Sequence, residues 1–401
     1  CRTRRNFRLG VPMKTISILG ATGSIGQNTL DLVSRESNKF QVKGLTGSKN
    51  IELLAQSAIK FGVDVVATAD DEKYLDLKNL LSGYDIEVCA GVSGLLEVAG
   101  READWVMSAI VGYAGLLPGL AALEAGANLA LANKESMVSA GPILKEVSNR
   151  KGVKIMPVDS EHSAISQVIR GENLDSLVKI IITASGGAFR NLSKSDLKNV
   201  TPDQAAKHPN WEMGKRITID SASLFNKALE VIEAKELFDL KASEIEVLIH
   251  PQSLVHAIAC FQDSGMKAHL SPPDMRHAIA YALHEEKRLN LSLKEIDLAS
   301  VGELIFEKPD TDKYPALDLG FDVIRQGGLA GAAFNAAKEQ ALDDFLNHQL
   351  KFTEMADVVR ATMDELVSQN RLDKVVELEA VKVVDNLARS VARKSAEKFQ
   401  I

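Results

Sequence analysis

The sequence of 401 residues is poor in cysteine, and its three cysteines, Cys1, Cys89 and Cys260, lie far apart. No two of them have the close spacing of a zinc or redox motif, which indicates free thiols in a reducing compartment. No apolar run is long enough to span a membrane. The net charge of -7 argues against a nucleic-acid-binding surface. What remains, 45% apolar and 25% charged residues, is the composition of an ordinary globular protein.

The first twelve residues, CRTRRNFRLGVP, contain four arginines and no acidic residue. We expect them to be an expression leader or the product of an upstream start, with the remnant of a transit peptide as the alternative. The folded pattern begins around Met13. A chain of this length exceeds what one hydrophobic core usually serves, so two or three domains are expected.

Short apolar runs alternate with helical patterns in residues 13–158. The runs TISIL, FQVKGLT, DVVAT, EVCA, DWVMSAI and NLALA have the length of buried strands, and helical stretches such as 51–61 separate them. This alternation predicts βαβ units and a parallel sheet.

The pattern changes twice farther along the chain. In residues 159–285, the segments LVKIIITASGG, ITID, EIEVLIH and LVHAIACFQ predict a second sheet with helices between its strands. Residues 286–310 read as a linker, and apolar residues at helical spacing predict a small helical bundle in 311–401. We therefore expect an α/β protein with a Rossmann-type parallel-sheet domain, an α+β catalytic domain that also dimerises, and a C-terminal helical bundle.

A glycine turn, GATGSIG at residues 20–26, stands between a predicted strand and a predicted helix. Such a turn lets a pyrophosphate approach the backbone at a helix N-terminus, although a tight turn without a ligand is the alternative. An NAD enzyme usually has an acidic residue after the second strand. This chain instead has Ser48, Lys49 and Asn50, which favour NADPH over NADH unless the segment is a plain polar turn.

Carboxylates with the spacing of a metal site occur in VDSEH, where Asp159 and Glu161 stand two apart. In an extended segment their side chains point the same way. Together with Glu230 they form an all-oxygen set that suits Mg²⁺ or Mn²⁺ rather than Zn²⁺. The alternative is that Asp159 and Ser160 cap the following helix, and His162 reads as a packing or supporting residue rather than a ligand.

A phosphate site is predicted downstream, in DSASLFNKALE. We expect a strand at ITID and then a helix opened at Asp220, on which Asn226, Lys227 and Glu230 share one face. The N–H groups and dipole of a helix start favour an anion. Ser185, in the glycine turn ASGG, can join this site, with an ordinary turn as the alternative.

Two loops complete the set of polar segments. LANKES follows an apolar strand, so Asn133, Lys134 and Glu135 are expected at the carboxyl end of the sheet, unless the segment is a solvated turn. The loop HPNWEMG carries His208, Trp211 and Met213 together with a proline and a glycine. It predicts a lid that closes over the substrate and excludes water; a packed surface loop is the alternative.

With GATGSIG, LANKES, VDSEH, ASGG, HPNWEMG and DSASLFNKALE in this order, the sequence resembles the 1-deoxy-D-xylulose 5-phosphate reductoisomerases from Met13 to the C-terminal helices. The pair VDSEH and HPNWEMG is specific, whereas the glycine turn alone is not. The resemblance implies NADPH- and divalent-metal-dependent conversion of 1-deoxy-D-xylulose 5-phosphate to 2-C-methyl-D-erythritol 4-phosphate, in the non-mevalonate isoprenoid pathway. It also implies a cytoplasmic homodimer without nucleic-acid or membrane partners, or a plastid-type location if residues 1–12 derive from a transit peptide.

The resemblance further implies roles for individual residues. Those implied to contact NADPH are Thr22, Gly23, Ser24, Ile25, Ser48, Lys49, Asn50, Asn133, Glu135 and Gly214. Those implied to bind one cation (Mg²⁺ or Mn²⁺, with Co²⁺ as a substitute) are Asp159, Glu161 and Glu230. Those implied to bind substrate are Lys134, Ser160, Glu161, Ser185, His208, Ser221, Asn226, Lys227 and Glu230, of which Lys134, Glu161 and Glu230 are the catalytic candidates. Thr-Gly-Ser-Lys-Asn departs from the Ala-Gly-Lys-Asn or Ala-Gly-Ser-Asn of many relatives, and this departure bears on Ser48.

The implied chemistry is polarisation of a ketone by the cation, rearrangement by retro-aldol cleavage and aldol rejoining, and hydride transfer from NADPH. A simple NADP-dependent dehydrogenase is one alternative, but it has no evident need of three carboxylates beside a phosphate site. A semialdehyde dehydrogenase would need a catalytic cysteine, and neither Cys89 nor Cys260 stands in such a motif. An NADPH-sensing regulatory protein that has kept the fold is the alternative from another class.

Overall fold

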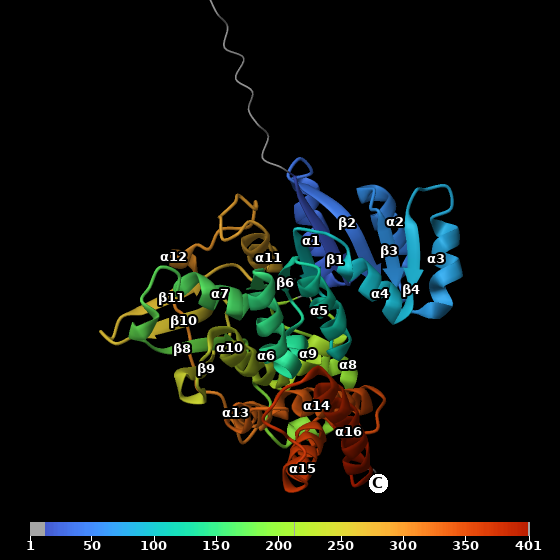
Figure 1. Cartoon of the computed structure of the whole chain (residues 1–401). Coiled ribbons are helices and arrows are strands. Elements are labelled where there is room, and N and C mark those ends of the chain that lie inside the picture. Colours follow the sequence, from blue (N-terminus) through green and yellow to red (C-terminus); the bar gives the residue numbers. More distant parts are fainter. Residues whose placement is uncertain (1–12, 212, 400–401) are drawn as a thin grey trace, which may run out of the picture.

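The chain folds into three parts, which follow one another from the amino-terminal sheet to the carboxyl-terminal helices (Figure 1). The computed structural model describes residues 13–211 and 213–399. The predicted leader, residues 1–12, lies outside the described residues. Within those residues, no helix is long and apolar enough to cross a membrane.

The first part is a seven-stranded sheet in the order β4-β3-β2-β1-β5-β6-β7, and all its pairs are parallel. Its strands are β1 (Lys14–Leu19), β2 (Phe40–Gly47), β3 (Val65–Thr68), β4 (Glu87–Ala90), β5 (Trp105–Ser108), β6 (Asn128–Leu131) and β7 (Ile155–Pro157). The α-helices are α1 (Ser24–Arg35), α2 (Ile51–Phe61), α3 (Tyr74–Leu80), α4 (Gly91–Gly100), α5 (Leu116–Glu124) and α6 (Lys134–Lys151). The predicted parallel sheet is confirmed, and only the three-residue β7 had no visible pattern.

The strand order reverses at β1 and β5, and this reversal fixes where a ligand binds. From β1, the strands β2, β3 and β4 follow one another outward to one edge of the sheet, and β5, β6 and β7 follow one another outward to the other edge. Ligands of such sheets bind at the carboxyl ends of the strands beside the reversal. The glycine turn follows β1 and an irregular loop follows β5, so both lie at this place.

The second part is a four-stranded mixed sheet in the order β11-β10-β8-β9, with β8 parallel to β9 and antiparallel to β10. Its strands are β8 (Leu177–Ala184), β9 (Ile245–Ile249), β10 (Val255–Phe261) and β11 (Met266–Leu270). The associated α-helices are α7 (Ser160–Val168), α8 (Pro202–Ala205), α9 (Lys215–Ala222), α10 (Phe225–Phe238) and α11 (Met275–Leu283). This α+β arrangement agrees with the expectation, although the exposed edge strand β11 was not predicted.

The expected strand at ITID, residues 217–220, was wrong. These residues form the middle of α9, which begins after Gly214. Four alternating residues fit a helix as well as a strand, so the pattern alone could not decide. The next helix, α10, begins at Phe225 rather than at Asp220, because Leu224 has a left-handed backbone (φ 61°) that separates the two helices.

The third part is helical, as predicted. After an irregular connector that contains only the short α12 (Leu298–Val301) among its described helices, the chain forms α13 (Ala316–Gln326), α14 (Ala330–Leu346), α15 (Glu354–Ser368) and α16 (Leu378–Glu397). The central helix α14 is buried over most of its length and packs against α15, α16 and α6. Helix α13 packs against α10. The C-terminal helices therefore support α6 and α10, two of the helices from which active-site residues are expected.

Candidate active site

One cavity of about 430 Å³ lies where the three parts meet. The first part contributes the glycine turn after β1, the loop after β5 and the start of α6. The second part contributes the starts of α7 and α10, the end of β8, and the loop 208–214. Helix α14 of the third part adds Lys338 and Glu339. The cavity thus gathers most of the polar segments that the sequence singled out.

Three carboxylates converge in this cavity. One oxygen each of Asp159, Glu161 and Glu230 lies within 4.8 Å of the other two. A donor set made only of carboxylate oxygens is the kind that Mg²⁺ and Mn²⁺ prefer, so these residues fit a divalent cation.

The extended conformation expected for VDSEH was wrong, although its two carboxylates do lie together. Asp159 is the N-cap of α7, where its Oδ1 accepts the Ser160 N–H at 3.0 Å, and Glu161 lies in the first helical turn. The helix cap and the carboxylate cluster, which stood as alternatives, are therefore both present. Capping occupies Oδ1 of Asp159, while its Oδ2 forms an ion pair with Lys134.

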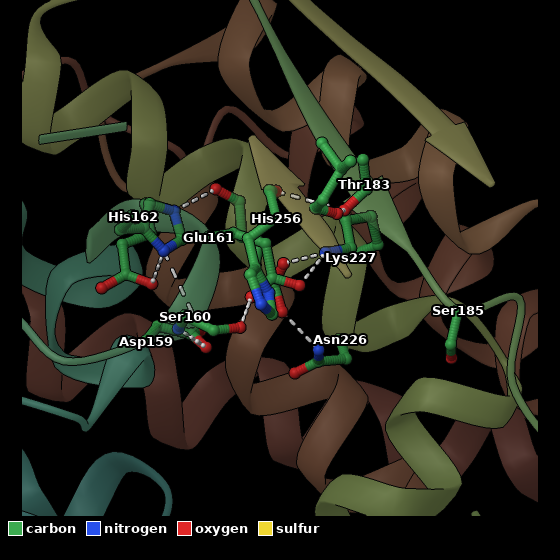
Figure 2. A network of polar contacts seen from close by, with 12 residues as sticks. Asp159, Ser160, Glu161, His162, Thr183, Ser185, Asn226, Lys227 and His256 are labelled. Atoms are coloured by element: carbon green, nitrogen blue, oxygen red, sulfur yellow. Dashed lines mark hydrogen bonds and ion pairs between the residues drawn. The ribbon is translucent and has the colours of Figure 1, made fainter. Parts of the chain in front are cut away.

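Two buried lysines, Lys134 and Lys227, balance part of the negative charge, and Figure 2 shows Lys227 beside Glu161. Lys134 forms an ion pair with Asp159, lies 3.1 Å from Glu230 Oε1, and donates to Asn226 Oδ1 at 2.8 Å. Lys227 lies 2.7 Å from Glu161 Oε1 and also pairs with Glu230. When all three carboxylates are ionised, they and the two ammonium groups sum to a charge of -1, which makes the cluster attractive to a further cation.

This crowding moves the pKa values of the groups in different directions. Burial and the neighbouring Glu161 raise the pKa of Glu230 to about 7. Burial also acts to raise the pKa of Glu161, but Lys227 outweighs it and the pKa is lowered. Burial disfavours the charged form of Lys134, yet Asp159 and Glu230 raise its pKa well above the ordinary value. Lys134 therefore keeps its proton at neutral pH, whereas Glu230 shares one until a cation replaces it.

A second buried pair, His162 and Glu233, lies behind the carboxylates. His162 Nδ1 is 3.3 Å from Glu233 Oε2, and its Nε2 is 2.9 Å from the Glu230 carbonyl oxygen. Burial lowers the pKa of His162 to about 4, so the ring is neutral and its Nε2–H donates to that carbonyl. The ring therefore joins α7 to α10 and holds the two helices that carry the cluster. Asp159, His162 and Glu233 form a second group with ligand spacing, and Glu233 was missed although it follows Glu230 by one helical turn.

The residues expected around a phosphate also line the cavity. They are Ser185, His208, Ser221, Asn226 and Lys227. The Ser185 hydroxyl lies 3.0 Å from His208 Nε2 and accepts the Gly187 N–H at 3.1 Å. Figure 2 shows Ser185 at a strand end, on the side of Asn226 and Lys227 away from the carboxylates. Donors for an anion therefore lie to one side of the cation cluster.

The loop 208–214, expected to be a lid, borders the cavity through His208, Trp211, Met213 and Gly214. It has no regular structure at its described residues and is organised by one ring: His208 Nδ1 accepts the N–H groups of Asn210 at 3.1 Å and Trp211 at 3.0 Å. Burial lowers the pKa of His208, which agrees with this acceptor role. Trp211 packs edge-on against His256, with ring centroids 6.2 Å apart.

The cofactor side of the cavity is formed by the glycine turn and the start of α6. Gly23, Ser24, Ile25, Asn133 and Glu135 line it. A Cβ on Gly26 would lie 2.4 Å from the Gly20 carbonyl oxygen, so the turn depends on glycine there. The helix α1 begins at Ser24, within this motif, which leaves its first N–H groups free for an anion.

Four residues expected to contact NADPH do not line the cavity itself: Thr22, Ser48, Lys49 and Asn50. The last three are exposed after β2, and Asn50 caps α2 by accepting the Leu53 N–H. Thr22 lies close to the end of β2, since its methyl group is 3.3 Å from the position of a Cβ on Gly47. The two segments therefore adjoin at the carboxyl edge of the sheet.

Sequence reasoning missed several residues of the cavity. The loop 109–112, His256 and Met275 carry no recognisable local motif. Lys338 and Glu339 come from α14, more than a hundred positions after Glu230, the last of the expected site residues. Lys338 Nζ lies 2.9 Å from Asp220 Oδ2 in a buried ion pair, so α14 is joined to α9 beside the cavity.

Comparison with known proteins gives three matching family models, described as 1-deoxy-D-xylulose 5-phosphate reductoisomerase (residues 16–141), its C-terminal domain (155–238), and DXP reductoisomerase C-terminal domain (270–391). The 1-deoxy-D-xylulose 5-phosphate reductoisomerase of Ruegeria sp. (strain TM1040) is 52% identical over 381 residues, covering 95% of this chain and 96% of that protein. That of Ruegeria pomeroyi is 51% identical, covering 94% and 96%.

Solved structures agree. The reductoisomerase from Zymomonas mobilis in complex with NADPH is 40% identical, with a TM-score of 0.89 over 96% of this chain and all of that chain. DOX-P reductoisomerase in complex with NADPH, fosmidomycin and magnesium is 37% identical, with a TM-score of 0.92 over 96% of this chain and 98% of the other. Similarity of this extent, together with a cavity that gathers the expected motifs, shows that the chain belongs to the 1-deoxy-D-xylulose 5-phosphate reductoisomerase family.

Proposed function

We infer that this protein is an NADP-dependent oxidoreductase that converts 1-deoxy-D-xylulose 5-phosphate to 2-C-methyl-D-erythritol 4-phosphate with NADPH and a divalent cation. The observation that carries the inference is the meeting of three groups in one cavity: the glycine turn, the three carboxylates and the donors near Ser185. When bound, the cation supplies Lewis-acid polarisation of substrate oxygens and NADPH supplies a hydride.

Residue roles follow from the placement of the groups. Asp159, Glu161 and Glu230 hold the cation. Lys134 and Ser160, beside this cluster, contact the reacting end of the substrate. The phosphate is bound by Ser185, His208, Ser221, Asn226 and Lys227. Because the phosphate is remote from the reacting carbons, its binding energy serves to orient them.

Proton movements are assigned to two groups. Lys134 remains protonated, since its carboxylate neighbours raise its pKa, and it acts as a donor to developing negative charge rather than as a base. Glu161, whose pKa is lowered mainly by Lys227 against the effect of burial, stays ionised. Glu230 releases its proton when the cation arrives, because its raised pKa of about 7 depends on burial and on the repulsion of Glu161.

NADPH is held between the glycine turn and the start of α6. Gly23, Ser24 and Ile25, with Thr22 at the turn, bind its phosphates, and Asn133, Glu135 and Gly214 lie along the rest of the cofactor. Ser48, Lys49 and Asn50 bind the adenosine end outside the cavity, at the exposed edge of the sheet. A ribose 2′-phosphate fits a position with one lysine and no acidic side chain.

The loop 208–214 acts as the lid, with His208, Trp211 and Met213 over the substrate. We also propose that residues 13–158, 159–285 and 311–401 are the cofactor, catalytic and helical domains, joined by a linker at 286–310. The working form is a homodimer in the bacterial cytoplasm, with Mn²⁺ or Co²⁺ able to replace Mg²⁺. The dimer is what the family resemblance implies, and the bacterial relatives support the location.

The test is turnover with defined reactants. The protein is mixed with 1-deoxy-D-xylulose 5-phosphate and NADPH, with and without Mg²⁺, and the nicotinamide absorbance is followed while the product is identified by mass and carbon connectivity. We expect metal-dependent oxidation of NADPH and a branched product. Oxidation that yields an unbranched alcohol would indicate a simple dehydrogenase, and NADPH binding without turnover would indicate a sensor.

A further inference from the structure

The loop after β5, residues 109–113, borders the cavity through residues 109–112, beside the start of α6. It lies outside the strands, although the Ala109 N–H donates to the Leu19 carbonyl of β1 at 2.9 Å, and Gly112 has a left-handed backbone with φ 79°. One side of the loop is held by Asn133, whose Nδ2 donates to the Ile110 carbonyl at 2.5 Å and the Gly112 carbonyl at 2.9 Å. Because Asn133 is itself an expected NADPH contact, the loop conformation and the cofactor position are linked.

The other side of the loop is held by Glu339, which belongs to the C-terminal helix α14. Glu339 Oε1 accepts the N–H of Tyr113 at 2.9 Å, across 226 positions of sequence. The approach is so close that a Cβ on Gly112 would lie 2.8 Å from Glu339 Oε1. The third part of the fold therefore reaches a loop of the nucleotide-binding sheet through the Glu339 side chain.

Glu339 is held in place from its own side. Its Oε1 accepts from Asn335 Nδ2 at 3.1 Å, and its Oε2 lies 2.7 Å from Arg389 Nη2. Burial acts to raise the pKa of Glu339, but Lys338 and Arg389 outweigh it and lower the pKa, so the group is ionised at neutral pH. A charged acceptor gives a stronger hydrogen bond to the Tyr113 N–H than a neutral one.

We propose that Glu339 is a positioning residue for NADPH: by accepting the Tyr113 N–H it holds the loop 109–113 in the conformation that receives the cofactor. The C-terminal helices are then part of the cofactor site as well as a support for the catalytic helix. This inference rests on the proposed placement of NADPH between the glycine turn and the start of α6.

The size of the expected change in NADPH affinity follows from how often the loop adopts its binding conformation. The apparent affinity for the cofactor is proportional to the fraction of time that the loop spends in its binding conformation. Removing a hydrogen bond to a charged acceptor costs enough to reduce that fraction by about tenfold or more. The affinity for the sugar phosphate should change far less, because the residues proposed for its phosphate lie at the end of β8, in the loop 208–214, and on α9 and α10.

Two substitutions separate the effect of side-chain length at position 339 from the effect of its charge. Glu339→Gln keeps the acceptor oxygen at the same length and loses the charge, whereas Glu339→Asp keeps the charge for Arg389 and is too short to reach Tyr113. The control is Asp385→Asn, because Asp385 also pairs with Arg389 at 2.8 Å but is not among the residues bonded to the loop. Three quantities are measured: the NADPH dissociation constant by fluorescence, KM for each substrate, and hydrogen exchange of the Tyr113 amide without cofactor.

Glu339→Asp should weaken NADPH binding by about tenfold, speed exchange at Tyr113, and leave KM for the sugar phosphate within about twofold. Glu339→Gln should retain most of the affinity, and Asp385→Asn should lower Tm without changing NADPH binding. The proposal is overturned if Glu339→Asp binds NADPH normally, or if Asp385→Asn weakens NADPH binding as much as Glu339→Asp does. Failure of the proposed function itself would show differently, as absence of NADPH binding or turnover in the unmodified protein.

Discussion

The substitution Glu230→Gln tests the electrostatics of the carboxylate cluster most sharply. The side chain is fully buried, and its two oxygens accept from Lys134, Lys227 and Asn226. An amide keeps the shape of the side chain, but it loses the charge and turns one NH2 group toward a donor. The exchange removes one of three negative charges that lie within 4.8 Å of one another. We expect a severe loss of turnover, with NADPH binding nearly unchanged.

The magnitude can be estimated from Coulomb's law. Two unit charges about 4 Å apart interact by roughly 4 kcal/mol at an effective dielectric constant near 20, so a carboxylate and a divalent cation interact by roughly 8 kcal/mol. Part of this is offset because the amide no longer repels Glu161. A net loss of about 3 to 4 kcal/mol corresponds to roughly 100- to 1,000-fold weaker cation binding.

The assay compares three quantities in the variant and in the unmodified protein: turnover at saturating Mg²⁺, Mn²⁺ affinity by electron paramagnetic resonance, and NADPH affinity by fluorescence. Glu236→Gln is the matched control, since Glu236 lies on the same helix but is not among the residues that line the cavity. The reasoning is refuted if Glu230→Gln keeps its Mn²⁺ affinity, or if it loses NADPH binding in step with turnover.

Three further outcomes are expected. In the protein without substrate, Mn²⁺ affinity should fall as pH drops below about 7, approaching tenfold per pH unit, because protons compete for Glu230 while its pKa is raised; a flat profile in a Mn²⁺ titration would contradict this. His208→Ala should raise KM for the sugar phosphate by about tenfold, because the ring contacts Ser185 and fixes the Trp211 N–H; unchanged KM and kcat would exclude that role. Phe334→Ala should lower the free energy of unfolding by about 3 to 5 kcal/mol, since Phe334 is fully buried in α14; denaturant titration measures this, and a loss below about 1 kcal/mol would show that the site collapses.

The sequence predicted the parallel sheet well because its strands are buried on both faces and therefore read as unbroken apolar runs. The strand predicted at ITID was wrong because the segment is too short. Over four residues, its alternation fits the helix α9 as well as a strand. Strand β11 was not predicted because Met266, Lys267 and Ala268 are all exposed at the sheet edge. These three residues therefore show no alternation of buried and exposed positions.

The candidate site was predictable where its residues belong to local motifs, as with Asp159, Glu161 and Glu230, which the structure brings together. Contacts that depend on packing between distant segments left no such pattern. Glu339 meets Tyr113 only because α14 packs beside α6, and Glu233 meets His162 only because α7 packs beside α10. Nothing within a short stretch of sequence records either contact.

The most direct measurement is an anomalous-scattering map of crystals grown with Mn²⁺, NADPH and the sugar phosphate. The account predicts one manganese peak bounded by Asp159, Glu161 and Glu230, with the phosphate beside Ser185 and the nicotinamide facing the same cavity. A peak centred among Asp159, His162 and Glu233 instead, or substrate bound with no manganese beside it, would contradict it.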